Sequence, residues 1–277
     1  MAVVVVTDSS SRLDPELHRE IRQVSLHILD GDTGLRDGVD PVPSDIQDRP
    51  GVTTSGPTPT ELADTYRRAL ADSGGDGVVA VHVSAGLSST YSKAVHAARE
   101  FGQAVRVVDS RSAGRGVGFV ALAAARSARA GAGLDAVEAA ARAAVGRGHA
   151  FIVVGRLDNL RRSGRIGTAA SWLGTALSLK PLLRIDEDGR LVLSQRIRTI
   201  SNAHAALIDQ VVDVVGDRQA EVAVHHVDNH DAADAIGAAL TSRLPQLKSL
   251  SVTDIGPVLA VHVGGGAGGV CVSVDDG

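Results

Sequence analysis

Hydroxyl side chains gather in short loops of the sequence, directly after runs that have the character of buried strands. The segment VHVSAGLSSTYSKA (81–94) places several of them between a strand-like run and a helix-like run: Ser84, Ser88, Ser89 and Thr90. A loop of this kind combines hydroxyl groups with free backbone N–H groups and the positive end of a helix dipole. That chemistry binds an anion or a carboxylate. Serine and threonine are also good helix N-caps, so each loop taken alone has a purely structural explanation.

Other loops have the same composition. The run AVVVV is followed by TDSSS (7–11), the run AVRVV is followed by Asp109 and Ser110, and the loop TTS (53–55) leads toward a helix. In open α/β sheets, ligands bind beyond the carboxyl ends of the strands. Several such loops together favour a binding site for an acidic group at that edge.

The elements that would position these loops alternate along the first half of the chain. Short apolar runs typical of buried parallel strands occur at 2–8, 76–84 and 104–110. Helical segments are expected at 88–101, 116–130 and 134–147. This alternation predicts a parallel sheet with helices on both faces. Further expectations are a helix from Pro15, one strand near 23–29, turns over 34–43, and a helix capped by Thr58 or Thr60 with Glu61 as capping-box partner.

From about residue 150 the pattern changes to hairpins mixed with helices. An antiparallel hairpin is expected over 180–199 around an Asp-Gly turn. Helices are expected near 168–177, 201–215 and 231–243, and strands at 150–155, 220–227, twice within 248–263, and at 268–274. The sequence therefore predicts an N-terminal parallel-sheet α/β domain (1–149) that carries the carboxylate-binding loops, followed by a C-terminal α+β domain (150–277).

Composition narrows the classes of function. Of 277 residues, 44% are hydrophobic and 2% aromatic, which predicts an aliphatic core. A net charge of −4 argues against a nucleic-acid partner, and no run approaches the roughly 18 apolar residues of a spanning helix, so no stable membrane insertion is expected. The single cysteine, Cys271, excludes an intramolecular disulfide and a cysteine zinc cluster. The start of the chain lacks the features of a signal peptide, and together these observations favour the cytoplasm.

An ordered set of motifs, from residue 3 to about 270, resembles the DegV family of bacterial fatty-acid-binding proteins. The motifs are VTDSSSRL, TTSGPTP, VSAGLSSTYSKA, VVDSRSAGRGVG, LDNLRRSGRI, SLKPLLRIDEDGRL and VHVGGGAGG. The resemblance implies a DegV-like two-domain protein that holds one long-chain fatty acid and needs no cofactor or metal. In the FakB-like branch such a protein is not an enzyme, and it presents the fatty acid to a separate fatty acid kinase that makes an acyl phosphate.

The resemblance also implies which residues contact the carboxylate. By position in the family motifs these are Thr54, Ser88 and His262, with Ser55 and Ser89 beside them. Two hydroxyls and an imidazole satisfy a buried carboxylate, and a protonated imidazole would do so best. This chain departs from the family pattern in having Ser89 at a glycine position and Ser84-Ala85 at a serine pair, which puts the geometry of the loop in question.

Two arginines of the second half are candidates for the pocket mouth or for contacts with the kinase. They are Arg165, at the end of the RRSGR motif, and Arg198, after the predicted hairpin. A basic surface exposed to solvent is the alternative explanation for the RRSGR segment.

An acyl ester hydrolase is the main alternative function. Ser88 would be its nucleophile and His262 its base, with Asp8 or Asp109 orienting the imidazole. The segment GLSST does not match the G-x-S-x-G elbow of such enzymes.

A nucleotide- or sugar-phosphate-binding enzyme and a metal site are further alternatives. GGGAGG (264–269) contains G-x-G-x-x-G, but a strand is expected after it instead of a helix, so a tight turn that brings His262 toward the ligand is favoured. The chain has no phosphate loop of the G-x-x-x-x-G-K-[ST] type. His226, His230 and Asp228 in HHVDNH are possible metal ligands, but a polar strand end is the favoured explanation.

Overall fold

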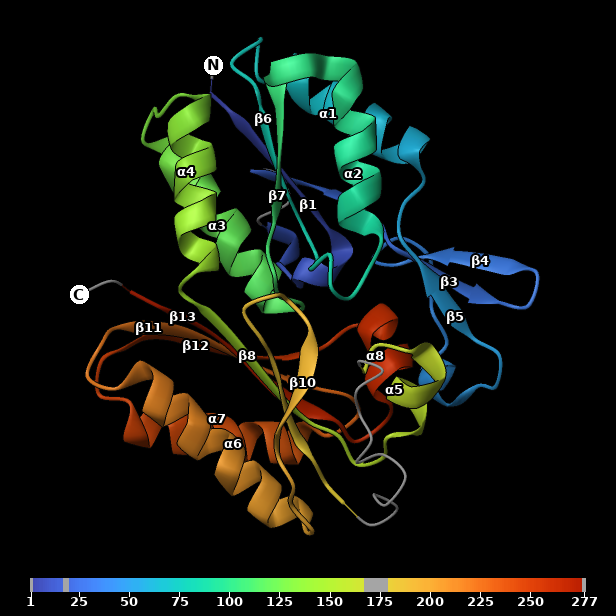
Figure 1. Cartoon of the computed structure of the whole chain (residues 1–277), viewed down its shortest axis with the longest axis vertical. Coiled ribbons are helices and arrows are strands. Elements are labelled where there is room, and N and C mark those ends of the chain that lie inside the picture. Colours follow the sequence, from blue (N-terminus) through green and yellow to red (C-terminus); the bar gives the residue numbers. More distant parts are fainter. Residues whose placement is uncertain (1, 17–19, 167–178, 276–277) are drawn as a thin grey trace. The chain divides into compact units, whose positions relative to one another are not determined.

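The computed structural model describes residues 2–16, 20–166 and 179–275. Contacts between residues divide the chain into two units (Figure 1), the first comprising Met1–Pro41 and Thr54–Gly148, the second Val42–Thr53 and His149–Gly277. The domains expected at 1–149 and 150–277 stay a prediction, and the units differ from them in the segment 42–53 and at His149. The helix expected at 168–177 lies outside the described residues, as does the 17–19 part of the helix expected from Pro15.

The first unit is built on a parallel sheet, as predicted. Its strands are β1 (Val4–Asp8), β2 (Ile21–Val24), β6 (Val78–His82) and β7 (Val105–Asp109), in the order β2-β1-β6-β7. All of the neighbouring pairs are parallel. The carboxyl ends of the strands therefore meet at one edge, and the loops that follow β1, β6 and β7 start from that edge.

Helices cover both faces of this sheet (Figure 1). The pairs are α1 (Pro59–Asp72) with α2 (Thr90–Ala98), and α3 (Arg115–Arg129) with α4 (Leu134–Val145). Alternate strand residues face the two layers: Val6 belongs to the core under α1 and α2, and Val5 to the core under α3 and α4. A 3₁₀ helix (Arg99–Ala104) follows α2, so the regular helix ends earlier than expected.

The start of α1 confirms a sequence prediction. Thr58 is the N-cap, and its hydroxyl accepts a hydrogen bond from the Glu61 N–H at 3.2 Å. The Glu61 carboxylate in turn accepts one from the Thr58 N–H at 2.7 Å. This reciprocal capping box fixes the point at which the loop carrying Thr54 enters the helix.

A three-stranded sheet corrects two expectations for residues 21–43. Its strands are β3 (His27–Asp30), β4 (Thr33–Arg36) and β5 (Thr53–Ser55), in the order β4-β3-β5. The single strand expected near 23–29 is wrong, because the chain leaves β2 at Ser25 and the Leu26 N–H donates to the Ser9 hydroxyl at 3.0 Å. The turn expected over 34–43 is wrong at its start, because Gly34–Arg36 pairs with β3 as an antiparallel hairpin.

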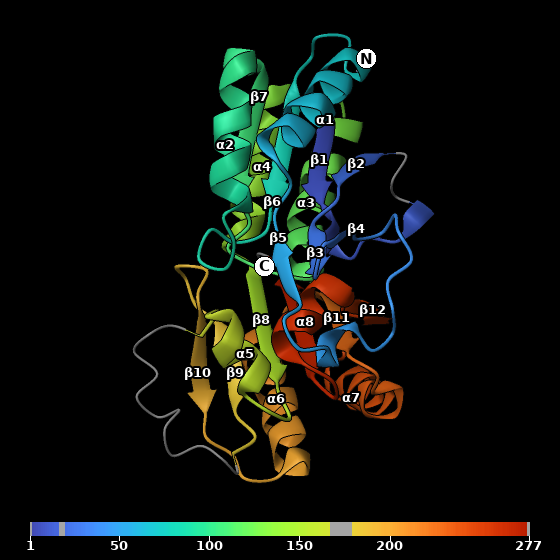
Figure 2. The ribbon, with the colours of Figure 1, turned by 90° about the vertical axis from the view of Figure 1, so that its right-hand side faces the viewer.

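The second unit contains a mixed six-stranded sheet. The strands are β8 (Gly148–Val153), β9 (Leu182–Ile185), β10 (Leu191–Gln195), β11 (Ala220–His226), β12 (Leu247–Asp254) and β13 (Gly268–Val274), in the order β10-β9-β8-β13-β11-β12. The predicted β9–β10 hairpin is confirmed (Figure 2). Helices α6 (Ile200–Val215) and α7 (His230–Arg243) pack on the sheet and close an aliphatic core.

Two short helices complete the second unit and correct a third expectation. They are α5 (Asp158–Ser163) and α8 (Pro257–Val263). The second strand expected within 248–263 is wrong, because PVLAVHV is helical. Gly256 adopts φ 88° and Pro257 occupies the first turn, a combination that starts a helix. Packing of the buried Val258 and Val261 then outweighs the strand preference of valine.

Among the described residues, no helix combines the length and the apolar character that crossing a membrane requires.

Gly118 of α3 lies where this helix approaches the turn after β1. A Cβ at Gly118 would lie 2.7 Å from the Ser11 carbonyl oxygen, a backbone atom that cannot rotate away. We expect Gly118→Ala to lower the free energy of unfolding by about 1–3 kcal/mol, measured by urea unfolding. Gly146→Ala is the matched control, because its Cβ would come no closer than 3.7 Å to another atom, the Ala143 carbonyl oxygen. Equal stabilities of the two variants would contradict the prediction.

Candidate functional site

The loop after β6 is wound around Ser84. The Ser84 N–H donates to the Ser112 carbonyl at 2.9 Å, which ties this loop to the one after β7. The Ser84 carbonyl accepts hydrogen bonds from the N–H groups of Leu87 and Ser88, each at 3.0 Å. The Gly86 N–H donates to the Ser84 hydroxyl at 3.1 Å. The loop is therefore held in one conformation by its own backbone and by its neighbour.

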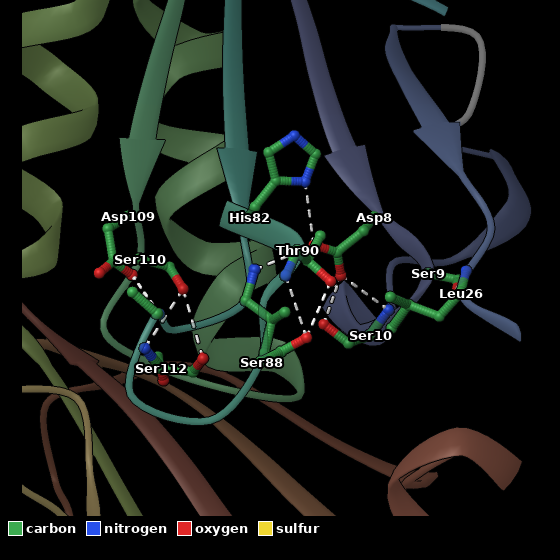
Figure 3. Close-up of polar contacts among 12 residues, drawn as sticks. Asp8, Ser9, Ser10, Leu26, His82, Ser88, Thr90, Asp109, Ser110 and Ser112 are labelled. Carbon is green, nitrogen blue, oxygen red and sulfur yellow. Dashed lines mark hydrogen bonds and ion pairs between the residues drawn. The ribbon is translucent and has the colours of Figure 1, made fainter. Parts of the chain in front are cut away.

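Ser88 and Thr90 form a pair of hydroxyls at the start of α2 (Figure 3). Their oxygens lie 2.9 Å apart, and the Thr90 N–H donates to the Ser88 hydroxyl at 3.2 Å. Thr90 is fully buried, whereas Ser88 is half-buried and accessible from the loop side. Ser89 is exposed and has φ −74°, a value that any residue adopts, so serine at the family's glycine position does not strain the backbone.

The loop carrying Thr54 and Ser55 meets the Ser88–Thr90 pair through Gly56. A Cβ at Gly56 would overlap the Thr90 hydroxyl and lie 3.3 Å from the Thr90 Cα. The Lys93 ammonium donates to the Gly56 carbonyl at 3.4 Å. Thr54 and Ser55 are half-buried. The structure thus brings together, within the first unit, two of the loops that the sequence singled out.

Behind these loops lies a fully buried polar network that the sequence did not predict. One Asp8 oxygen accepts hydrogen bonds from the Ser10 N–H, at 3.1 Å, and from the Ser10 hydroxyl. The other accepts from the Val83 N–H at 2.9 Å and lies 3.0 Å from His82 Nδ1 (Figure 3). His82 Nε2 lies 2.8 Å from the Tyr66 hydroxyl. Asp8, His82 and Tyr66 each have 0% exposure, so water does not share these contacts.

The protonation state of the Tyr66 phenol follows from its burial. Burial, followed in size by the nearby Asp8 charge, raises the pKa of the Tyr66 phenol above its ordinary value. The phenol therefore keeps its hydrogen, and its hydroxyl is hydrogen-bonded to His82 Nε2. His82 Nδ1 is hydrogen-bonded in turn to the Asp8 carboxylate. The chain Tyr66–His82–Asp8 links helix α1 to the ends of β6 and β1.

Hydrogen bonds within the first unit already engage the two carboxylates that a hydrolase would need. Both oxygens of Asp8 are occupied by partners within the first unit. Asp109 accepts hydrogen bonds from the N–H groups of Ala85, at 3.2 Å, and Arg111, at 2.9 Å. These carboxylates shape the loops at the sheet edge and already have backbone or imidazole partners.

A signal for the network is present in the sequence. His82 interrupts the apolar run VVAVHV, where a titratable residue needs a partner. The parallel register of β1 and β6 pairs Thr7 with Val81, which sets Asp8 beside His82. This register could not be known from the sequence of either strand.

His262 lies on α8 in the second unit, directly before a glycine turn in which Gly264 and Gly266 have positive φ. The predicted tight turn is therefore present. Burial, and secondly the charge of Arg165, lower the pKa of His262 from 6.5 to about 4. The imidazole is therefore neutral at pH 7 and does not carry the charge with which it would satisfy a carboxylate best. As a neutral group, an imidazole can donate one hydrogen bond and accept another.

Asn159 holds the helix of His262 in place. Its amide donates to the Val261 carbonyl at 3.1 Å and to the Gln47 carbonyl at 2.9 Å. A Cβ at Gly264 would lie 3.2 Å from the Asn159 side chain, so this glycine allows the close approach. The segment 42–53 therefore contributes contacts that hold α8 in place, although this segment lies far from α8 in the sequence.

The two arginines singled out in the sequence lie in different surroundings within the second unit. Arg165 is half-buried, beside His262, and its guanidinium donates to the Ser163 carbonyl at 2.5 Å. Arg198 is exposed after β10, directly before Thr199, the N-cap of α6.

The histidine-rich segment after β11 offers no metal site among the described residues. No group of three or more histidine, cysteine, aspartate or glutamate side chains there has a geometry that could hold an ion. The rings of His226 and His230 lie 4.0 Å apart, centre to centre. The Asp228 carboxylate accepts a hydrogen bond from the Gln47 amide at 2.9 Å.

A model of the family described as "Uncharacterised protein, DegV family" matches residues 2–275 of the chain. The chain belongs to the DegV family. A DegV domain-containing protein of Mycobacterium tuberculosis is 61% identical over 276 residues, covering 99% of this chain and 98% of the relative. This degree of identity extends the family assignment over both units.

Solved structures of DegV-family proteins have the same fold. A DegV family protein of Corynebacterium glutamicum is 34% identical, with a TM-score of 0.88 over 100% of this chain and 99% of its own. A DegV family protein of Thermus thermophilus, whose structure is described as showing fatty acid binding, is 32% identical, with a TM-score of 0.91 over 99% of this chain and 100% of its own. The predicted α/β fold of DegV type is thereby confirmed.

Proposed function

We propose that this DegV-family protein binds a long-chain fatty acid and holds its carboxylate at the hydroxyl-bearing loops of the first unit. The observation that carries the proposal is the meeting of the Thr54–Gly56 loop with the Ser88–Thr90 pair at the start of α2. Fatty acid binding by the Thermus thermophilus neighbour supports the ligand class. Thr54 and Ser88 are the proposed donors, and Ser55 and Ser89 flank them.

The resemblance to the family adds His262 of the second unit to the proposed set of carboxylate contacts. The neutral imidazole can donate or accept a hydrogen bond, but it contributes no positive charge at pH 7. On this proposal hydroxyl groups, more than charge, orient the head group.

The affinity would come mainly from the acyl chain. Burial of a methylene group contributes about 0.8 kcal/mol, so about fourteen methylenes supply roughly 11 kcal/mol before the costs of association. Few polar contacts are then needed, and their role is to fix which end of the lipid is bound. The aliphatic composition of the chain suits such a ligand, because 2% of its residues are aromatic.

We further propose that the protein does not modify the fatty acid itself and presents it to a separate cytoplasmic fatty acid kinase. Arg198, which is exposed, and Arg165, which is half-buried, are the proposed contacts with an acidic partner surface. The hydrolase alternative loses support because Asp8 and Asp109, its candidate orienting carboxylates, are engaged with other groups.

Purified protein should release a fatty acid on denaturation, as detected by mass spectrometry. Thr54→Ala/Ser88→Ala should retain at least about tenfold less of it, because two hydrogen bonds to a charged group are lost. Thr60→Ala, an exposed hydroxyl of α1, is the matched control and should retain the wild-type amount. A wild-type protein that neither contains fatty acid nor binds added fatty acid would refute the proposal. Labelling of Ser88 by a fluorophosphonate would favour the hydrolase.

A further inference from the structure

The Thr90 hydroxyl determines the hydrogen-bonding character of Ser88. Thr90 is fully buried, and in the part of the chain that the structure describes its hydroxyl has one hydrogen-bond partner, the Ser88 oxygen at 2.9 Å. A buried hydroxyl that leaves its hydrogen without an acceptor costs free energy. Thr90 therefore donates this hydrogen to Ser88.

Ser88 is left as a donor. A serine oxygen has two lone pairs and carries one hydrogen. The Thr90 hydroxyl fills one lone pair, and the Thr90 N–H, at 3.2 Å, fills the other. The Ser88 hydrogen remains, on a side chain that is half-buried and reachable from outside the loop. An oxygen acceptor from a ligand completes this arrangement, whereas a ligand donor finds no free lone pair.

The room for this arrangement comes from the neighbouring loop. Any side chain at position 56 would overlap the Thr90 hydroxyl, so the glycine permits Thr90 to take its place beneath Ser88. Thr90 is also the first residue of α2, which fixes its backbone N–H in the direction of the loop. Two elements of the first unit thus hold Thr90 in position.

We propose that Thr90 is a specificity-determining positioning residue, which presets Ser88 as a hydrogen-bond donor so that the site selects lipids whose head group offers an acceptor oxygen. A carboxylate meets this requirement, and an alkylammonium group, which only donates, does not. The proposal rests on the function proposed above, because it concerns the same head-group site. It differs in assigning the selectivity to a residue that need not contact the ligand.

Binding of palmitic acid and of hexadecylamine to delipidated protein tests the proposal, by displacement of a fluorescent fatty acid. Thr90→Val keeps the shape of the side chain and removes its hydroxyl, and it should bind palmitic acid about fivefold more weakly. Thr90→Ser, which keeps the hydroxyl, should bind within about twofold of wild type. The preference for the acid over the amine should fall in Thr90→Val and persist in Thr90→Ser.

A double-mutant cycle separates positioning from a general structural effect. If Thr90 acts through Ser88, then adding Thr90→Val to Ser88→Ala should weaken palmitic acid binding by less than about twofold. Circular dichroism checks folding, and Thr90→Ala, which is smaller, replaces Thr90→Val if that variant does not fold. Wild-type affinity in the valine variant, or an equal loss in both backgrounds, would overturn the inference. Failure of the wild type to bind palmitic acid would instead refute the proposed function.

Discussion

Asp8→Ala is expected to lower the free energy of unfolding by about 4 kcal/mol, because it leaves several buried donors without an acceptor. The Asp8 carboxylate accepts hydrogen bonds from the N–H groups of Ser10 and Val83, from the Ser10 hydroxyl and from His82. All four residues are buried: Asp8 and His82 have 0% exposure, Ser10 1% and Val83 4%. Urea unfolding at pH 7.5, followed by circular dichroism, measures the loss.

Two further variants show whether the loss comes from the buried network. Tyr66→Phe removes only the outer hydroxyl and should cost about 1 kcal/mol. Asp72→Ala breaks the ion pair with Arg22, whose two side chains are 42% and 48% exposed, and should cost less than about 0.5 kcal/mol. An Asp8→Ala variant as stable as Asp72→Ala would show that Asp8 does not hold this edge of the sheet together.

The network also explains why the hydroxyl loops keep a defined shape. Asp8 joins the end of β1 to Val83, the residue before Ser84, and the Ser84 N–H is bonded to the loop after β7. The position of Ser88 is therefore determined by strands and not by a flexible connection. A site built on rigid elements can orient a head group with few contacts.

Much of this architecture could be predicted from local sequence patterns. The continuous apolar runs of β1, β6 and β7 predict buried parallel strands, and the structure has them. The capping box at Thr58 and the hairpin of β9 and β10 follow from short-range chemistry and are also present. These features depend on residues close together in the chain, which is why the sequence indicates them.

The features that were not predicted depend on distant partners. Gly34 is a common turn residue, and only its pairing opposite Leu29 makes it part of a strand. The valines of α8 favour a strand until Gly256 and Pro257 start a helix whose apolar face is buried. The segment 42–53 joins the second unit through contacts such as that of Gln47 with Asn159, 112 residues apart in the chain.

The candidate site also combines features that local sequence predicts with features that depend on distant contacts. Hydroxyls at strand ends predicted an edge that binds an anion or a carboxylate, and the resemblance to the family singled out Thr54, Ser88 and His262. The roles assigned here to Thr90 and Gly56 arise from the contact between two loops, which neither loop reveals by itself. The charge state of His262 likewise depends on its burial in the folded chain and on Arg165 nearby.

The protein should lose stability between pH 7.5 and pH 5, and His262 should account for about 2 kcal/mol of the loss. Its pKa falls from 6.5 in the unfolded chain to about 4 in the folded one. Between these values the unfolded chain binds a proton at His262 that the folded chain does not, so acid favours unfolding. The stabilisation from the neutral imidazole is complete above pH 6.5 and declines as the pH falls toward 4. Full protonation would cost about 3 kcal/mol.

Urea unfolding of wild type and His262→Gln at both pH values isolates this contribution, since burial also lowers the pKa of His149, His204 and His226. The glutamine variant should show a decline smaller by about 2 kcal/mol. Arg165→Met removes the cation beside His262, so the pKa of the imidazole should rise. The decline in stability should then be smaller than in wild type, but the change should be less than that in His262→Gln. A decline in His262→Gln equal to that of wild type would mean that the imidazole accepts a proton in the folded chain as readily as in the unfolded one. The lowered pKa of His262 would then be wrong, and the folded chain would gain a charged imidazole as the pH falls through 6.5.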